Sequence, residues 1–326
     1  MQRLLIYLLF FAALIIASQG ISESAGPKGF HLYVARFMDS DMVILDSMTH
    51  KEIGRVEFGF GSNPVEILPS MDKRLLYVSL RGTDEVAVID VKSRKIKKRI
   101  KGVYHSQFME ISPDGRHLIV ANIRTPYITV IDLTTDEVKG KPHIGEGSAD
   151  VAVAANGIVY IAPAYDGDIS VIDLKEMKKI SAIKALASAI AISPDSTLLY
   201  FNDSSKNGLS ILDIKTNRII GDIHIGDSGR YITISQDGNM AFIPNYRRAI
   251  VTVIDLQTRV VVKDIAVGYE PATSALSPDG RFLYVVNYGN GDDDGSISVI
   301  DVKGLKEVER VKFYRWPRAI AVLPAG

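Results

Sequence analysis

The sequence predicts an all-β fold, a seven-bladed β-propeller with four antiparallel strands in each blade. The first observation is a short apolar run ending in aspartate, which occurs at Asp46, Asp90, Asp132, Asp173, Asp213, Asp255 and Asp301. Subtracting neighbouring positions gives spacings of 44, 42, 41, 40, 42 and 46 residues. A period of about 40 to 45 residues built from strand-like units is typical of propeller blades. The second observation is a tight turn, Ser-Pro-Asp-Gly or a close variant, which begins at Ser112, Ser193, Ser235 and Ser277.

The third repeat shows how the residues predict each strand of a blade. Residues 108–112 form a short inner strand, and residues 113–115 form a turn in which proline fixes φ and glycine permits positive φ. Residues 117–121, 127–133 and 137–144 follow as the second, third and outer strands. Their alternating, β-branched composition supports this assignment.

The two ends of the chain are predicted to complete one blade together. Residues 28–59 supply a second, a third and an outer strand but no inner strand, whereas residues 317–323 resemble an inner strand with no partners after it. We therefore expect the C-terminal strand to complete the first blade, which removes the exposed edges of an open ring. The propeller is expected to span residues 25–326 as one domain.

Residues 1–24 differ in composition and are predicted to be a signal peptide or an N-terminal anchor. Arg3 is followed by an uncharged run over residues 4–16 and by small residues around Gly20. This run is shorter than the roughly 20 residues that a spanning helix needs. The protein is therefore expected to be exported, to the periplasm, the cell surface or the extracellular space. Membrane contact is expected only through an uncleaved N-terminus.

Composition and motifs exclude several functions. The 38 basic and 38 acidic residues balance, which argues against nucleic-acid binding. The absence of cysteine excludes disulfides, covalent CxxCH haem attachment and a thiol nucleophile. Neither a Gly-x-Ser-x-Gly elbow nor an HExxH motif occurs. No catalytic residue is assigned, and the sequence favours a binding protein over an enzyme.

Functional residues are expected where the blades differ. In a propeller, the loops before the inner strands and those between the second and third strands share one face, which we call the funnel face. Its predicted ligand-binding residues are Arg36, Arg81, Tyr104, His105, Arg124, Arg230, Tyr246, Arg247, Tyr269, Arg315, Trp316 and Arg318. Arginine binds carboxylate or phosphate through a bidentate fork and stacks on planar rings, so this set suits a small, planar, anionic ligand. The alternative is that the arginines pair with acids of the same loops: Glu146, Asp150, Asp166, Asp203, Asp227 and Glu270.

The repeat unit resembles a known family. Residues 283–287 read Leu-Tyr-Val-Val-Asn, with Ser-Pro-Asp-Gly before them and Val-Ile-Asp after them. These units resemble the YVTN family of β-propeller repeats over roughly residues 28–326. The resemblance implies the propeller architecture, which carries many different activities.

A second resemblance covers a shorter stretch. Residues 77–81 and 86–90, His105, and residues 112–116 resemble part of the d1-haem domain of cytochrome cd1-type nitrite reductases and related haem-d1 biosynthesis propellers. The resemblance implies that Arg81 corresponds to an arginine that holds haem carboxylates. His105 lies two residues before the position of the family's iron-ligating histidine, which Gln107 occupies in this chain. That family has eight blades, whereas seven repeats occur in this chain.

Three functions follow from these observations. The first is an exported, non-enzymatic binding module that meets a protein or cell-envelope partner through the funnel face without a cofactor. The second is a tetrapyrrole-binding or redox accessory propeller, which requires Arg81, Arg124, His105 and Arg315 to converge in one cavity. The third, a metal-assisted hydrolase, requires clustered histidines and carboxylates. The sequence favours the first function because it demands the least.

One loop is a candidate calcium site. Asn290, Asp292 and Asp294 place oxygen-bearing side chains at alternate positions before Gly295, like the start of a calcium-binding loop. The alternative is a solvated acidic loop.

Overall fold

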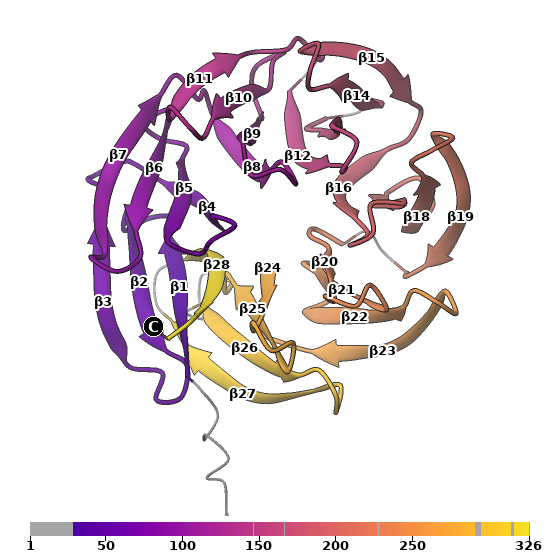
Figure 1. The fold of residues 1–326 in the computed structure, drawn as a ribbon. Coiled ribbons are helices and arrows are strands. Elements are labelled where there is room, and N and C mark those ends of the chain that lie inside the picture. Colours follow the sequence, from indigo (N-terminus) through magenta and orange to yellow (C-terminus); the bar gives the residue numbers. More distant parts are fainter. Residues whose placement is uncertain are drawn as a thin grey trace, which may run out of the picture.

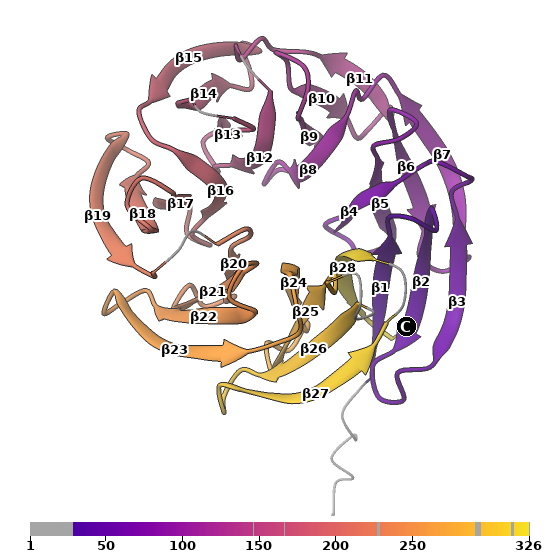
Figure 2. The same ribbon diagram turned by 180° about the vertical axis from the view of Figure 1, so that it is seen from behind.

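Seven four-stranded sheets surround a central opening in the computed structural model (Figure 1; Figure 2 shows the opposite side). The structure describes residues 29–145, 147–165, 167–226, 229–290, 295–313 and 316–325. Every strand pair within these residues is antiparallel, from the inner strand beside the opening to the outer strand at the rim. The predicted seven-bladed propeller is confirmed.

Blades 1 to 4 each begin with the inner strand beside the opening and end with the outer strand. Blade 1 contains β28 (Pro317–Pro324), β1 (Phe30–Arg36), β2 (Asp41–Asp46) and β3 (Glu52–Glu57). Blade 2 contains β4 (Pro64–Pro69), β5 (Leu75–Leu80), β6 (Glu85–Asp90) and β7 (Lys95–Lys101). Blade 3 contains β8 (Ser106–Ile111), β9 (His117–Asn122), β10 (Thr129–Asp132) and β11 (Glu137–Gly140). Blade 4 contains β12 (Ser148–Val153), β13 (Ile158–Pro163), β14 (Ile169–Asp173) and β15 (Lys178–Ile183).

Blades 5 to 7 follow the same order. Blade 5 contains β16 (Ala187–Ile192), β17 (Leu198–Asp203), β18 (Gly208–Asp213) and β19 (Arg218–His224). Blade 6 contains β20 (Thr233–Ile234), β21 (Met240–Asn245), β22 (Ile250–Asp255) and β23 (Val260–Ala266). Blade 7 contains β24 (Pro271–Leu276), β25 (Phe282–Asn287), β26 (Ser296–Asp301) and β27 (Lys306–Lys312).

The C-terminal strand β28 completes blade 1, as the sequence predicts. It pairs antiparallel with β1 in a register that runs from Phe30 opposite Pro324 to Arg36 opposite Pro317. The amide of Ala325 donates to the carbonyl of Gly29 at 3.1 Å, so the two ends of the described chain lie side by side. The ring is therefore closed by hydrogen bonds between strands from opposite ends of the sequence.

The seven repeated aspartates stabilise the turns that follow them. Asp46 Oδ1 accepts hydrogen bonds from the amides of Met48 and Thr49 at 3.1 and 2.8 Å. The same bond to a turn amide recurs at Asp90, Asp132, Asp173, Asp213, Asp255 and Asp301. These carboxylates stabilise the scaffold in every blade and do not form a shared site.

The core lies between neighbouring blades rather than at the centre of the ring. One cluster joins Tyr33 and Ile44 of blade 1 to Leu76 and Ile89 of blade 2, and similar clusters follow around the ring. Because the apolar side chains pack between sheets, the inner strands can direct polar side chains toward the axis.

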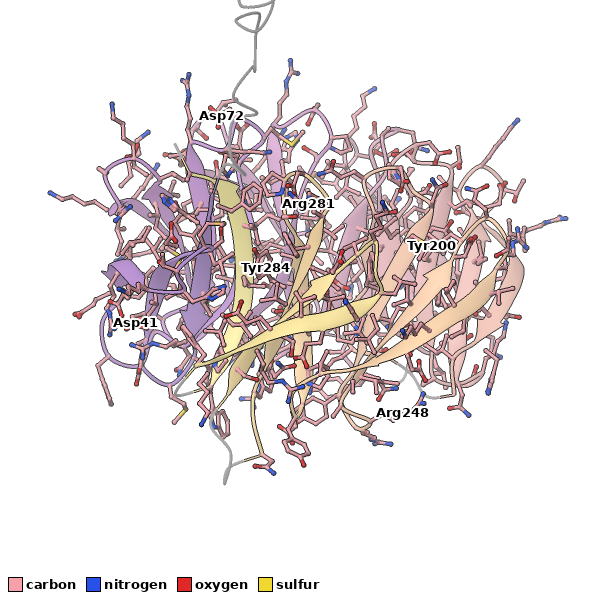
Figure 3. The ribbon with its side chains drawn as sticks, turned by 90° about the horizontal axis from the view of Figure 1, so that it is seen from below. Asp41, Asp72, Tyr200, Arg248, Arg281 and Tyr284 are labelled. Atoms are coloured by element: carbon pink, nitrogen blue, oxygen red, sulfur yellow. The ribbon has the colours of Figure 1, made fainter. Side chains whose placement is uncertain are left out.

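Backbone hydrogen bonds join the loops of the funnel face within single blades. In blade 2 the amide of Arg81 donates to the carbonyl of Asn63 at 3.2 Å, which ties the β5–β6 loop to the segment before β4. Tyr288 and Glu270 make the same connection in blade 7. Figure 3 shows Asp72 of a Ser-Pro-Asp-Gly-type turn toward one face of the ring and Arg248 toward the other.

The predicted signal segment, residues 1–24, lies outside the described residues. Within the part of the chain that the structure describes, no helix is long and apolar enough to cross a membrane.

Candidate ligand-binding site

Three arginines from separate blades converge at the funnel-face mouth of the central channel. Arg318 belongs to β28, Arg81 follows β5, and Arg230 precedes β20. Burial and the nearby charge of Arg318 lower the pKa of Arg81 to about 10, with smaller contributions from Arg124 and Arg230. Burial and the charge of Arg230 likewise lower the pKa of Arg318. The mouth is therefore a concentrated patch of positive charge.

Aromatic rings and backbone carbonyls hold these guanidinium groups in place. Arg318 lies over the ring of Tyr288 at 5.0 Å, and Arg230 lies over that of Tyr246 at 4.8 Å. The two tyrosine rings meet edge to face with centroids 6.2 Å apart. Arg81 donates to the carbonyl of Ser106 at 3.2 Å and to the side-chain carbonyl of Gln107. Such cation–π contacts favour the charged state without neutralising it.

The described arginines of the funnel face differ in whether they pair with a carboxylate. Arg36 pairs with Asp39 at 2.7 Å and with Asp41 at 2.5 Å, and Arg248 pairs with Asp264 at 2.8 Å. Arg81, Arg230 and Arg318 form no ion pair with any carboxylate among the described residues. Among the described residues, pairing with carboxylates therefore accounts for Arg36 and Arg248 but not for the three mouth arginines.

The remaining predicted residues spread over the funnel face. Tyr104, Tyr269 and Trp316 are about half exposed around the rim. Arg124 is exposed and lines a shallow hollow of about 650 Å³ with Tyr165, and Arg247 is exposed beside Tyr246.

His105 is held by its backbone rather than by its imidazole. It has a positive φ of 46°, and its amide donates to Asp84 Oδ1 at 2.9 Å. Within the described residues, its imidazole forms no hydrogen bond with the mouth arginines, whereas Gln107 contacts Arg81 directly. Gln107, and not the imidazole of His105, is therefore in direct contact with the arginine cluster.

Three residues predicted to bind a ligand or calcium lie outside the described residues: Arg315, Asp292 and Asp294. Three of the candidate acidic partners of the arginines, Glu146, Asp166 and Asp227, also lie outside them. Asn290 is described and exposed. The proposed calcium loop therefore stays a prediction.

The channel narrows below the arginines. On the mouth side, a cavity of about 340 Å³ is lined by Gln107, Phe108, Tyr165 and Arg230, among others. The rings of Phe108 and Tyr231 then meet with centroids 5.4 Å apart and planes inclined by 47°. Their blades lie on different sides of the central opening (Figure 1), so the two rings bridge the channel.

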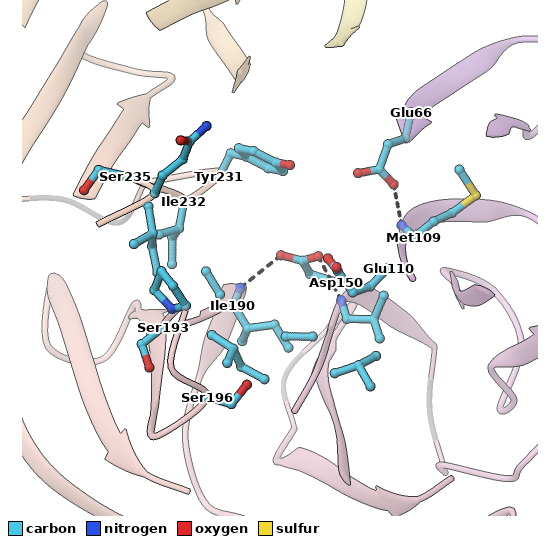
Figure 4. Close-up of a pocket in the computed structure, with 18 residues that line it drawn as sticks. Glu66, Met109, Glu110, Asp150, Ile190, Ser193, Ser196, Tyr231, Ile232 and Ser235 are labelled. Carbon is cyan, nitrogen blue, oxygen red and sulfur yellow. Dashed lines mark hydrogen bonds between the residues drawn. The ribbon is translucent and has the colours of Figure 1, made fainter. Parts of the chain in front are cut away.

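An acidic chamber that sequence reasoning missed lies beside this aromatic bridge. Glu66 of β4, Glu110 of β8 and Asp150 of β12 point with Tyr231 into a cavity of about 580 Å³ (Figure 4). Glu66 accepts the amide hydrogen of Met109, and Asp150 accepts those of Val151 and Ile190 at 2.8 and 2.9 Å. Asp150 therefore belongs to the channel, and the expectation that it pairs with funnel-face arginines is wrong.

Burial makes these carboxyl groups unusually weak acids. It raises the pKa of Glu110 to about 8, with a further contribution from Asp150, and raises the pKa of Asp150 to about 7. Burial and the charge of Asp150 also raise the pKa of Glu66 well above its ordinary value. Tyr231 beside them has a raised pKa for the same reasons.

A simple sequence pattern could have found the chamber. Glu66, Phe108, Asp150 and Tyr231 each lie four residues before the first residue of their turn, at Ser70, Ser112, Ala154 and Ser235. Equal distance from the turn places them at one level of the channel. Glu110 lies two residues after Phe108 and so shares its strand face.

No metal centre is evident at either level of the channel. Within the described residues, no group of three or more His, Asp or Glu side chains is placed to hold a metal ion. A metal-assisted hydrolase would need such a cluster, and these residues do not form one.

Solved structures share this architecture at low sequence identity. Hydrazine synthase from Kuenenia stuttgartiensis superposes with a TM-score of 0.71 and 20% identity, over 83% of this chain and 92% of that chain. The dihydro-heme d1 dehydrogenase NirN in complex with DHE gives 0.65 and 17%, over 86% of this chain and 63% of that chain. A functionally unknown protein from Desulfotomaculum acetoxidans DSM 771 gives 0.76 and 14%, over 91% and 99%. At these identities the likeness concerns the fold.

Family models match both halves of the chain. The model of the YNCE-like beta-propeller matches residues 27–192, and that of a domain of unknown function, DUF5074, matches residues 142–313. No curated protein sequence matches the chain. The first match covers half of the sequence and agrees with the repeats, the closure and the blade topology. The chain belongs to the YNCE-like β-propeller family.

Proposed function

We propose that this propeller is a non-enzymatic binding module whose funnel face receives an anionic group of its partner. The observation that carries the proposal is the convergence of Arg81, Arg230 and Arg318 without a carboxylate partner among the described residues. Arginine side chains that lower one another's pKa gain most from an added carboxylate or phosphate, because it relieves their mutual repulsion.

The chemistry of this mouth supports binding rather than catalysis. The guanidinium groups supply positive charge and hydrogen-bond donors, and the surrounding tyrosine rings supply flat apolar walls. Arginine stays protonated at neutral pH, and burial raises the pKa values of Tyr246 and Tyr288, so these groups are poor bases there. A rigid ring with half-exposed aromatic side chains at its rim instead suits a protein or cell-envelope partner.

A tetrapyrrole with carboxylate groups is a second candidate for the anionic partner. Its support is that the charges of Arg318, Arg124 and Arg230 lower the pKa of Arg81, so these arginines lie near one another. This function requires Arg81 and Arg124 to converge. NirN, whose structure is a complex with DHE, shares the fold. His105 is held through its backbone amide. We therefore propose that the arginines would hold the carboxylates of a tetrapyrrole, rather than that His105 would ligate its iron.

Binding of planar carboxylates tests the proposal. We expect benzene-1,3,5-tricarboxylate to bind the wild-type protein in isothermal titration calorimetry and to raise its unfolding temperature. Arg81→Gln and Arg318→Gln should each weaken binding about 10- to 100-fold, because each removes a charge-assisted hydrogen bond. Haemin, followed by its absorption spectrum, tests the tetrapyrrole candidate with the same variants.

The matched control is Arg247→Gln, which removes an exposed arginine of the same face outside the cluster. It should leave the affinity for both probes nearly unchanged. The mouth would be rejected as an anion site if all three variants had equal affinities. It would also be rejected if the wild-type protein bound neither benzene-1,3,5-tricarboxylate nor haemin. Binding of haemin alone would select the tetrapyrrole candidate.

A further inference from the structure

The outer strand of blade 2 carries an unusual concentration of positive charge. β7 reads Lys-Ile-Lys-Lys-Arg-Ile-Lys, with five cations and no acid. The turn before β7 adds Lys92. At the other end of β7, the Nζ of Lys141 from blade 3 lies close to Gly102. The whole chain has equal numbers of basic and acidic residues, so the charge of β7 is a local feature.

The other six outer strands provide an internal comparison. Counting Lys and Arg against Asp and Glu gives −1 for β3, 0 for β11, +2 for β15, 0 for β19, 0 for β23 and +1 for β27, against +5 for β7. Lysines on an edge strand protect it from pairing with other chains. The outer strands of the other blades occupy the same place and carry far less positive charge. Protection against pairing with other chains therefore does not by itself explain the charge of β7.

Only some of these cations have structural roles. Arg99 pairs with Glu85 at 2.9 Å and donates to the carbonyl of Phe58 at 2.6 Å. Lys98 donates to the carbonyl of Thr135 at 3.0 Å and so ties blade 2 to blade 3. The side chains of Lys95, Lys97 and Lys101 are exposed and form no hydrogen bond or ion pair with other described residues. We call these three lysines the basic edge.

The geometry of the basic edge is linear. β7 is the last strand in the order β4-β5-β6-β7, so among the described residues no strand is hydrogen-bonded to the outer side of its backbone. Seven residues of strand extend for about 23 Å. Free backbone groups along a cationic line match an extended acidic chain, which can pair with an edge and neutralise its lysines. A lipid surface would instead be matched by a broad, flat basic patch.

We propose that the free edge of β7 is a docking site for an extended, acid-rich segment of a partner protein. The site lies at the rim of blade 2, on a different part of the molecule from the arginine mouth (Figure 1). It does not depend on the function proposed for that mouth.

Fluorescence anisotropy with a labelled peptide of alternating glutamate and threonine, long enough to span β7, tests this site. We expect the wild-type protein to bind the peptide more weakly as salt is added. The triple variant Lys95→Gln, Lys97→Gln, Lys101→Gln should weaken binding about fivefold or more, since exposed charge pairs contribute modestly but add along a strip. Backbone N-methylation of the peptide, which keeps its charge, should also weaken binding.

The matched control removes the same charge elsewhere. Lys178→Gln, Lys263→Gln and Lys306→Gln together neutralise exposed lysines on the outer strands of blades 4, 6 and 7 and should leave peptide affinity unchanged. Equal loss in both triple variants would overturn the proposal. So would failure of the wild-type protein to bind the peptide while it binds vesicles of phosphatidylglycerol and phosphatidylcholine. Arg81→Gln should not alter peptide binding, which separates the two sites.

Discussion

Removal of the C-terminal strand is expected to unfold the propeller. A protein ending before Trp316 loses β28, whose residues Ile320, Val322 and Leu323 are buried against β1 and the neighbouring blades. Burying each such side chain contributes about 1.5–3 kcal/mol, so the strand accounts for about 5–9 kcal/mol. That is comparable to the whole stability of a typical domain, about 5–15 kcal/mol. We expect loss of the cooperative thermal transition in circular dichroism.

Adding the missing strand as a separate peptide provides the control. A synthetic peptide of residues 316–326 should restore the transition in a concentration-dependent way, because β28 is joined to blade 1 by pairing with β1 rather than by sequence proximity. A peptide with Ile320 and Val322 replaced by aspartate should fail to do so. A truncated protein that melts at the wild-type temperature would show that the propeller does not need the pairing of β28 with β1.

The architecture could be predicted from the sequence because its determinants are local and repeated. Blades 3, 5, 6 and 7 share a similar turn after the inner strand, and all seven blades have the same aspartate at the end of the third strand, so the copies support one another. The blade closure was predictable for a related reason, since residues 28–59 lack one strand and residues 317–323 provide one. Strand ends differ by only a few residues from those expected, as at β10, which begins at Thr129 rather than at Tyr127.

The pairing of individual arginines was harder to predict because it depends on neighbours across strands. Arg36 lies directly opposite Asp41 in the β1–β2 register, and this cross-strand pairing neutralises it. Arg81 also follows a second strand but has Gln107 as its side-chain partner, from the next blade. Arg36 is the last residue of β1, whereas Arg81 follows the end of β5 by one residue, and this small shift in register changes which side chains each arginine meets.

Because of the acidic chamber, we expect the free energy of unfolding to depend on pH in an unusual way. Glu110 and Asp150 have native pKa values of about 8 and 7, above those of unfolded carboxyl groups. The folded protein therefore binds more protons than the unfolded chain as the pH falls from about 8 towards the ordinary carboxyl values. Each extra proton raises the free energy of unfolding by about 1.4 kcal/mol per pH unit. The protein should thus be more stable at mildly acidic pH than at pH above 8.

The turn aspartates act in the opposite direction at lower pH. Turn hydrogen bonds lower the pKa values of Asp90, Asp132 and Asp213, so their stabilisation is present above the unfolded pKa of about 4 and is lost below it. The two effects together place the maximum of stability on the acidic side of neutrality, just above the ordinary carboxyl pKa of about 4. Urea unfolding at a series of pH values measures the free energy directly.

Two variants separate the chamber from the rest of the surface. Glu110→Gln keeps the shape of the side chain but cannot ionise, so it should raise stability at alkaline pH and reduce the slope by one proton. Glu137→Gln, an exposed glutamate of β11, is the matched control and should leave the slope unchanged. If the wild-type protein gains no stability between pH 8 and 6, the carboxyl groups of the chamber are ionised in the folded state. The chamber would then have to be open to water and counter-ions along the channel.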